Sequence, residues 1–126
     1  MSRKIISTPN APAAIGTYSQ AVQVDNTVYI SGQIPLDPKT GSAVEGDIVV
    51  QIRQVFENLK AIAEEAGGTL NSAVKYNVFL TDLGNFASVN QVMEEYLDAP
   101  YPARAAVQVA ALPKGVEVEV DAILVV

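Results

Sequence analysis

Apolar residues recur three and four positions apart over residues 47–66, which is the spacing of one helix face. Asp47 precedes the first of them and can accept hydrogen bonds from the free N–H groups of a helix start. Gly67 and Gly68 follow the last, and glycine commonly terminates a helix. The pattern therefore predicts a helix over 47–66 that packs one stripe on a core. The stripe comprises Ile48, Ile52, Val55, Phe56, Leu59, Ile62, Ala63 and Ala66.

A second, shorter helix is predicted after the turn-forming segment 81–85. Its apolar residues again recur at helical spacing and form a single stripe. Pro100 and Pro102 cannot continue a helix, so they end this element and force an extended chain before Arg104. The stripe comprises Phe86, Val89, Met93, Tyr96 and Leu97.

Alternation of apolar and polar residues predicts strands in most of the remaining chain. Two short strands, 22–24 and 27–30, are joined by a tight turn, and a longer strand, 73–80, lies between the helices. Two more strands, 104–110 and 116–126, complete the chain. This order predicts an α/β or α+β domain with both helices on one face of the sheet, and the other face is left open unless another subunit covers it. The apolar face of the 73–80 strand comprises Val74, Tyr76, Val78 and Leu80.

The last two predicted strands each carry polar side chains on one face. If they form an antiparallel hairpin, the register that joins their apolar faces also places Arg104 opposite Asp121 and diagonal to Glu119. Three carboxylates would then face one guanidinium, and packing them dry would cost several kcal/mol. This face is therefore either exposed surface or a polar pocket. The three acids are Glu117, Glu119 and Asp121.

The size and composition of the chain indicate how it is organised. With 126 residues it is expected to form a single domain over 1–126. Hydrophobic residues make up 49% and charged residues only 17%, whereas a typical soluble domain is about 25% charged. So apolar a chain has more apolar surface than one small core absorbs, and we expect an oligomer. The net charge of −6 opposes non-specific binding to nucleic acid, because the phosphates would be repelled.

The chain contains no cysteine and no histidine. This excludes disulfides, thiolate chemistry, the commonest metal ligand and the commonest general base. The uncharged stretch 5–24 is interrupted by prolines and polar residues, so it predicts neither a signal peptide nor a membrane helix. We therefore expect a cytoplasmic protein.

Arg104 stands out against this sparse chemistry, because the only other arginines are Arg3 and Arg53. A guanidinium stays charged at physiological pH and offers a planar fork that matches a carboxylate or a phosphate. An arginine followed by an acidic strand suggests a site that binds an anion and moves protons nearby. The alternative is that Arg104 simply forms an ion pair with one of those acids.

Five short motifs follow one another along the chain: residues 15–21 (IGTYSQA), 30–35 (ISGQIP), 101–104 (YPAR), 112–114 (LPK) and 118–120 (VEV). In order and spacing they resemble the RidA (YjgF, also called L-PSP endoribonuclease) family, and the resemblance extends along the whole chain. It implies a chorismate-mutase-like α+β subunit with a mixed sheet and two helices on one face. It further implies a homotrimer whose sheets form a central barrel, with pockets between subunits.

The resemblance also implies an enzyme. Family members that carry the arginine hydrolyse reactive enamines and imines, such as 2-aminoacrylate and its imine form, to 2-keto acids and ammonia without a cofactor. For this chain it implies a 2-iminobutanoate/2-iminopropanoate deaminase that acts on a small carboxylate substrate. An imine carbon is already electrophilic, so orienting the carboxylate and a water can suffice without a nucleophile or a metal.

Two residues would carry this chemistry if the resemblance holds. Arg104 would bind the substrate carboxylate, preferably through two parallel hydrogen bonds. Glu119 would position or deprotonate the attacking water, or pass a proton to the departing ammonia. Both are the expected catalytic residues.

Four further residues match the family at positions that border the pocket. Tyr18 and Ser31 would donate hydrogen bonds to the ligand, and Gly32 would let the backbone approach it closely. Asn90 falls in the family's Val-Asn position on the second helix and would line the same cleft. Their structural alternatives are a core or interface role for the tyrosine and a simple turn for residues 31–32.

The sequence departs from the family pattern at two positions. Thr17 stands where many members have proline, which bears on the stiffness of that loop. Ala106 stands where many active members have cysteine near the arginine. That thiol is not essential to the proposed hydrolysis, so its loss affects the shape of the pocket more than the activity.

Three functions from different classes compete at this point. The first is the imine deaminase. The second is an endoribonuclease, which is disfavoured because RNA cleavage usually needs an acid–base pair with histidine and a basic groove. The third is a non-catalytic, metabolite-binding or chaperone-like trimer that uses Arg104 only to hold a carboxylate.

Overall fold

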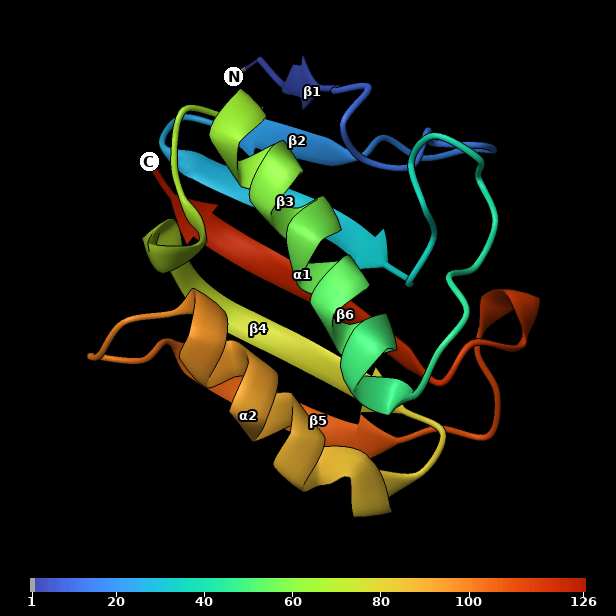
Figure 1. Ribbon diagram of the computed structural model, residues 1–126. Coiled ribbons are helices and arrows are strands. Elements are labelled where there is room, and N and C mark those ends of the chain that lie inside the picture. The colour runs from blue at the N-terminus through green and yellow to red at the C-terminus, as the bar shows by residue number, and fades with distance from the viewer. Residues whose placement is uncertain (1) are drawn as a thin grey trace.

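The computed structural model describes residues 2–126 and has a mixed α+β architecture (Figure 1). The order of its elements agrees with the prediction, except that one short strand precedes those foreseen. The strands are Lys4–Ile6 (β1), Ala21–Val24 (β2), Thr27–Gln33 (β3), Ala73–Leu80 (β4), Ala103–Gln108 (β5) and Val118–Val125 (β6). The helices are Ile48–Glu65 (α1) and Phe86–Tyr96 (α2).

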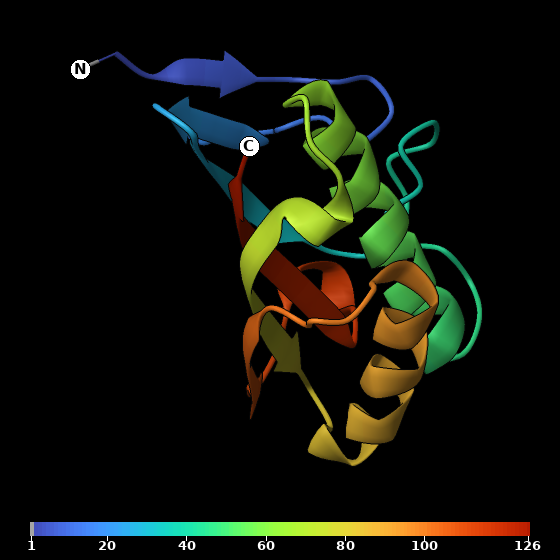
Figure 2. The same ribbon diagram turned by 90° about the vertical axis from the view of Figure 1, so that its left-hand side faces the viewer.

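All six strands form one sheet in the order β1-β2-β3-β6-β4-β5. Neighbouring strands are antiparallel except β4 and β5, which run parallel and are connected through α2. Both helices cover the same face, as the two views show (Figures 1 and 2). The predicted arrangement of helices is thereby confirmed. Within residues 2–126, no helix is long and apolar enough to cross a membrane.

The local signals predicted for α1 are confirmed. The carboxylate of Asp47 accepts a hydrogen bond from the N–H of Val50 at 3.0 Å and caps the helix start. The helix ends at Glu65 with Ala66 as its C-terminal cap, and Gly67 follows with a φ of +88°, a conformation that favours glycine. The core lies between the helices and the sheet. Its fully buried members include Val28, Ile52, Val55, Phe56, Leu59, Ile62, Tyr76, Val78, Val92, Val118 and Leu124.

The predicted hairpin between the last two strands is wrong. Strand β4 lies between β5 and β6, so Arg104 pairs with Tyr76, whereas Asp121 pairs with Asn77. Alternation along a strand determines which side chains share a face, but not which strand lies alongside.

Two side chains also lie on the opposite side from the one predicted. The pairing of β4 with β6 shifts by one residue between Ala73 and Lys75, and this bulge leaves Val74 exposed. Glu117 precedes β6 and accepts a hydrogen bond from the side-chain amide of Gln51 on α1 at 2.9 Å. It therefore does not share the face of Glu119, contrary to the prediction.

Candidate active site

Arg104 lies on the helix-covered side of the edge strand β5, beneath α2. Its Nη1 donates a hydrogen bond to Oδ1 of Asn90 at 2.5 Å and lies 3.6 Å from the sulfur of Met93. Its guanidinium carbon is 4.8 Å from the ring centroid of Phe86, within the range of a cation–π contact. Helix α2 thus supplies all three contacts that orient the guanidinium.

Arg104 borders a hollow of about 310 Å³ at the edge of the sheet. Among residues 2–126 the only salt bridge joins Arg53 to Glu95, so Arg104 has no acidic partner in the chain. The alternative, that Arg104 simply forms an ion pair with an acid of the last strand, is therefore wrong. The guanidinium remains available for an anion from outside. The hollow is lined by Asn90, Met93, Glu94, Tyr101, Pro102 and Arg104.

Glu119 lies on the opposite, uncovered side of the sheet, on β6. It is half-buried and borders a separate, larger hollow of about 720 Å³. Apolar side chains from the N-terminal segment and from the loop after β3 supply much of the wall. The hollow brings together four of the predicted site residues: Tyr18, Ser31, Gly32 and Glu119.

Gly32 is needed here because of the carboxylate beside it. A Cβ atom at position 32 would lie 2.1 Å from Oε2 of Glu119, far closer than atoms can approach. Any other residue would have to displace the carboxylate. The sequence predicted that Gly32 allows a close backbone approach, and the group that approaches is a side chain of the protein.

Ser31 and Tyr18 differ in what they can offer a ligand. The hydroxyl of Ser31 donates to the backbone carbonyl of Ser19 at 2.5 Å, so its hydrogen is already used and its oxygen can only accept. The hydroxyl of Tyr18 accepts a long hydrogen bond of 3.4 Å from the N–H of Ile15 and keeps its own hydrogen. Tyr18 is therefore the available donor of the two.

The acidity of Glu119 is altered by its surroundings. Partial burial raises the pKa of its carboxyl, and the negative charge of Asp121 on the same face of β6 raises it further. Asn77 fixes Asp121 by donating a hydrogen bond to its Oδ1 at 2.8 Å. A carboxylate with a raised pKa accepts protons more readily than an ordinary surface acid, which suits a general base.

Gln20 ties the N-terminal wall of this hollow to the sheet. Its side chain is only 3% exposed. Its Oε1 accepts a hydrogen bond from the N–H of Thr8 at 2.7 Å, and its Nε2 donates to the carbonyls of Thr8 at 3.0 Å and Pro12 at 2.8 Å. The segment that continues through Tyr18 is thereby anchored at its start.

The predicted site residues therefore form two groups on opposite faces of one sheet. Arg104 and Asn90 lie beneath α2, whereas Tyr18, Ser31, Gly32 and Glu119 surround the hollow on the uncovered face. A single copy of the chain does not bring the guanidinium and the carboxylate together. In the described chain, no cluster of three or more acidic side chains is arranged to hold a metal ion.

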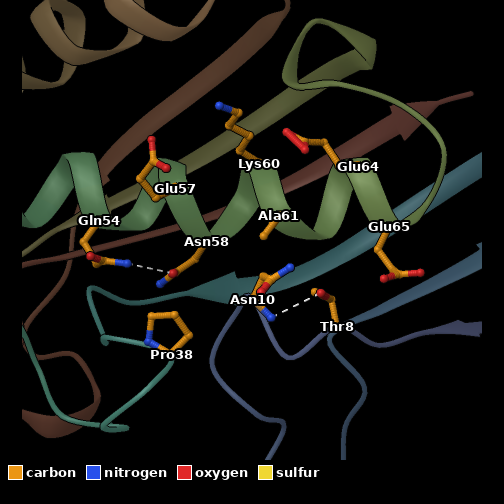
Figure 3. Close-up of a pocket in the computed structure, with 10 residues that line it drawn as sticks. All are labelled: Thr8, Asn10, Pro38, Gln54, Glu57, Asn58, Lys60, Ala61, Glu64 and Glu65. Atoms are coloured by element: carbon orange, nitrogen blue, oxygen red, sulfur yellow. Dashed lines mark hydrogen bonds between the residues drawn. The ribbon is translucent and has the colours of Figure 1, made fainter.

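A third hollow, of about 610 Å³, runs along α1 and contains none of the predicted site residues (Figure 3). Its buried amide, Asn58, is fully occupied, since it accepts from Gln54 at 2.9 Å and donates to the carbonyls of Ile34 at 3.3 Å and Leu36 at 3.0 Å. These bonds fasten the loop after β3 to α1. We assign this groove a structural role.

Sequence reasoning did not single out two residues at these hollows. Phe86 was predicted only as part of the apolar stripe of α2, yet its ring lies against Arg104. Lys114 borders the hollow of Glu119, with a φ of +57° and its Nζ 3.3 Å from the carbonyl of Gly41. The helical spacing of Phe86, Asn90 and Met93 was a usable signal for Phe86. Lys114 lies in the LPK motif at 112–114, which was a usable signal for the second residue.

Comparison with protein families identifies the chain. A family model described as Endoribonuclease L-PSP matches residues 8–126. The chain belongs to this family. The RidA resemblance drawn from the five motifs is thereby confirmed.

A named relative and the family model describe different functions. The chain is 53% identical over 123 residues to 2-iminobutanoate/2-iminopropanoate deaminase of Mus musculus, an alignment that covers 98% of this chain and 91% of the mouse protein. The family model, in contrast, is described as an endoribonuclease. Family membership alone therefore leaves the activity to be argued from the site.

Two solved structures of the family resemble this one closely. RidA from the Antarctic bacterium Psychrobacter sp. PAMC 21119 is 61% identical, with a TM-score of 0.94 and coverage of 98% of this chain and 99% of that one. E. coli TdcF, solved with bound serine, is 46% identical, with a TM-score of 0.90 and 98% coverage of both chains. The α+β subunit is thus the fold of this family.

Proposed function

We propose that the protein is a 2-iminobutanoate/2-iminopropanoate deaminase that hydrolyses enamines and imines of the 2-aminoacrylate type to 2-keto acids and ammonia. The observation that carries the proposal is a guanidinium that is hydrogen-bonded to Asn90 at a hollow and has no acidic partner among residues 2–126. Such a group fits a substrate carboxylate. The similarity to the mouse deaminase supports the reaction class.

In the proposed reaction, Arg104 fixes the substrate through its carboxylate. Glu119 accepts a proton from a water as the water oxygen bonds to the imine carbon. The same carboxyl passes this proton to the imine nitrogen, which gives a carbinolamine. It then transfers the remaining hydroxyl proton to the amine nitrogen, so that the C–N bond breaks as the C=O bond forms and ammonia leaves. Tyr18 can donate a hydrogen bond to the reacting groups, and the Ser31 oxygen can accept one.

We further propose that the working unit is a homotrimer with its sites between subunits. Arg104 and Glu119 lie on opposite faces of the sheet, so a site that uses both must combine two copies. The uncovered face also exposes apolar side chains, including Tyr29 and Val125, which a second copy would bury. A cytoplasmic location and a single domain over 1–126 stay predictions from the sequence.

Of the alternatives, carboxylate binding without catalysis has one specific observation in its favour. The relative TdcF was solved with bound serine, a ligand that carries a carboxylate. No observation favours RNA cleavage, because the chain has no histidine and a net charge of −6. Turnover of an imine therefore separates the proposal from its nearest competitor.

The deciding experiment measures deamination of freshly generated 2-aminoacrylate by the wild type, Arg104→Lys and Arg104→Ala. We expect kcat/KM to fall at least about tenfold with lysine, which keeps the charge but not the fork, and further with alanine. Thermal unfolding should change little, because Arg104 is exposed and has no ion pair.

The matched control is Arg53→Lys, which alters the exposed Arg53–Glu95 salt bridge between the helices and should keep full activity. Near-normal activity in both Arg104 variants would exclude the mechanism. Lost activity together with an unfolded chain would instead assign Arg104 a structural role. Absence of deamination by the wild type, with retained binding of 2-keto acids, would favour the non-catalytic alternative.

A further inference from the structure

In the described chain, one nitrogen of the Arg104 guanidinium donates hydrogen bonds, and the edge formed by its other two nitrogens is free. One hydrogen of Nη1 points to Oδ1 of Asn90 at 2.5 Å and the sulfur of Met93 accepts the other at 3.6 Å. Within residues 2–126, Nε and Nη2 have no acceptor. These two nitrogens carry the parallel N–H groups that form one edge of the guanidinium fork.

Phe86 provides a second contact to this guanidinium. Its ring lies under the guanidinium, 4.8 Å from the central carbon to the ring centroid. A hydrogen bond at one nitrogen still allows the group to swing about that contact, whereas an aromatic ring on the central carbon limits the swing. Together the two contacts restrain the position of the guanidinium.

We propose that Phe86 is a positioning residue, which with Asn90 presents the Nε–Nη2 edge of Arg104 to the carboxylate of the ligand. The inference rests on the proposed role of Arg104 as the carboxylate-binding group. Asn90, which the sequence predicts to line the substrate cleft, lines the hollow of Arg104 and also positions its guanidinium.

The surroundings of Phe86 favour this role over a structural one. Phe86, Asn90 and Met93 follow one another at helical spacing, so one face of α2 delivers all three contacts to Arg104. Val89 and Val92 of the same helix are completely buried in the core, but Phe86 is half-buried. In the described chain it belongs neither to the buried core nor to the half-buried apolar residues packed against that core.

The test measures binding of 2-oxobutanoate to the full-length protein by calorimetry, with Phe86→Leu and Phe86→Tyr compared with the wild type. Leucine keeps an apolar side chain but removes the flat aromatic surface, so we expect the affinity to fall about 3- to 30-fold. Tyrosine keeps that surface and should bind within about twofold of the wild type. Thermal unfolding of each variant accompanies the measurement, and Phe86→Met replaces Phe86→Leu if the latter does not fold.

A double-mutant cycle shows whether the ring acts through Arg104. In an Arg104→Ala background, Phe86→Leu should weaken binding no further. In the deaminase assay, Phe86→Leu should raise KM with little change in kcat, because the ring orients the binding group and touches no reacting atom.

Three results would overturn the proposal: unchanged affinity in Phe86→Leu, equal weakening in Phe86→Tyr, or a loss that persists without Arg104. Failure of wild-type binding would overturn it as well. Because binding of a 2-keto acid requires no turnover, an inactive wild type that still shows the Phe86 dependence would contradict the deaminase and support the positioning role. The two proposals therefore fail separately.

Discussion

The ionised form of Glu119 is needed for the proposed activity but lowers the stability of the folded protein. Burial, assisted by the charge of Asp121, raises the pKa of its carboxyl, so the folded protein binds this proton more tightly than the unfolded chain does. The ionised form that a general base needs is thus the form that the fold disfavours. As pH rises from the ordinary glutamate pKa through the raised one, this group removes stability from the folded state.

We therefore expect Glu119→Gln to lose activity and gain stability. Turnover should fall about 10²- to 10⁴-fold, which is the usual effect of removing a general base, while binding of 2-oxobutanoate changes little. Wild-type activity should fall as pH drops through the raised pKa, where Glu119 becomes protonated. Thermal unfolding at neutral pH should occur at a higher temperature in the variant, and the difference should shrink in acid.

Glu117→Gln is the matched control, because Glu117 is exposed and hydrogen-bonded to Gln51 on the other side of the sheet. It should keep wild-type turnover and the wild-type pH dependence of activity. Unchanged turnover in Glu119→Gln would reduce Glu119 to a structural acid.

Gly32→Ala tests how tightly the position of that carboxylate is set. The new Cβ would lie 2.1 Å from Oε2 of Glu119, so the side chain must move out of its place. We expect kcat to fall at least about tenfold, since small displacements of a catalytic group have large effects. In a Glu119→Gln background the same change should cost much less, and an equally large loss there would show that Gly32 acts through something else.

Individual site residues could be predicted from the sequence, but their partners could not. Arg104 was found because a chain without cysteine or histidine leaves few candidates, whereas Glu119 was chosen among the three acids of its strand by the family resemblance. The ring beneath Arg104 was missed, because an apolar residue in a helical stripe normally packs on the core. Ser31 was expected to donate to a ligand, yet its hydroxyl donates to the chain itself. The partner of each side chain depends on distances in the folded protein, which the spacing of residues along the sequence does not determine.

At the scale of elements, the helices and most strands could be predicted because their signals are local. Capping by Asp47, the glycine after α1 and the alternation along β4 each act within a few residues. Pairing is not local. The parallel alignment of β5 with β4 places Arg104 under α2, and no pattern within β5 distinguishes this from a hairpin with β6. The three-residue β1 is too short to show alternation.

The segment between β1 and β2 depends on a single buried amide, and this gives a prediction at the element scale. Gln20→Ala would leave backbone groups of Thr8 and Pro12 without their partner, each worth about 1–3 kcal/mol when buried. We expect a clear loss of stability to chemical denaturation. Since the wall of the Glu119 hollow is then loosened at its start, KM should rise as well.

Gln23→Ala, in the strand that directly follows Gln20, provides the control, because the amide of Gln23 makes one exposed hydrogen bond, of 3.0 Å, to the carbonyl of Asp25. It should change stability by less than about 0.5 kcal/mol. Equal stability of the two variants would show that the anchoring of the segment does not depend on Gln20.

At the scale of the whole molecule, the sheet has one covered and one uncovered face, and the two halves of the proposed site are divided between them. Composition predicted that the bare face needs a partner, because so apolar a chain with so few charges cannot cover itself. Composition could not predict that Arg104 and Glu119 would face opposite ways. That division makes assembly a requirement for the proposed catalysis rather than only a source of stability.

Mixing two inactive variants tests this requirement. Arg104→Ala retains Glu119, and Glu119→Gln retains Arg104, so an interface that takes the arginine from one and the glutamate from the other is intact. In a cyclic trimer that contains both variants, one of the three interfaces is intact, so we expect about a third of wild-type activity from trimers purified through both tags. The variants are co-expressed with different tags, purified through both tags and assayed on 2-aminoacrylate, and sedimentation equilibrium verifies the trimer mass. Each variant alone should remain nearly inactive. Activity no higher than that of the separate variants, in trimers that contain both, would place the whole site within one copy and contradict the shared arrangement.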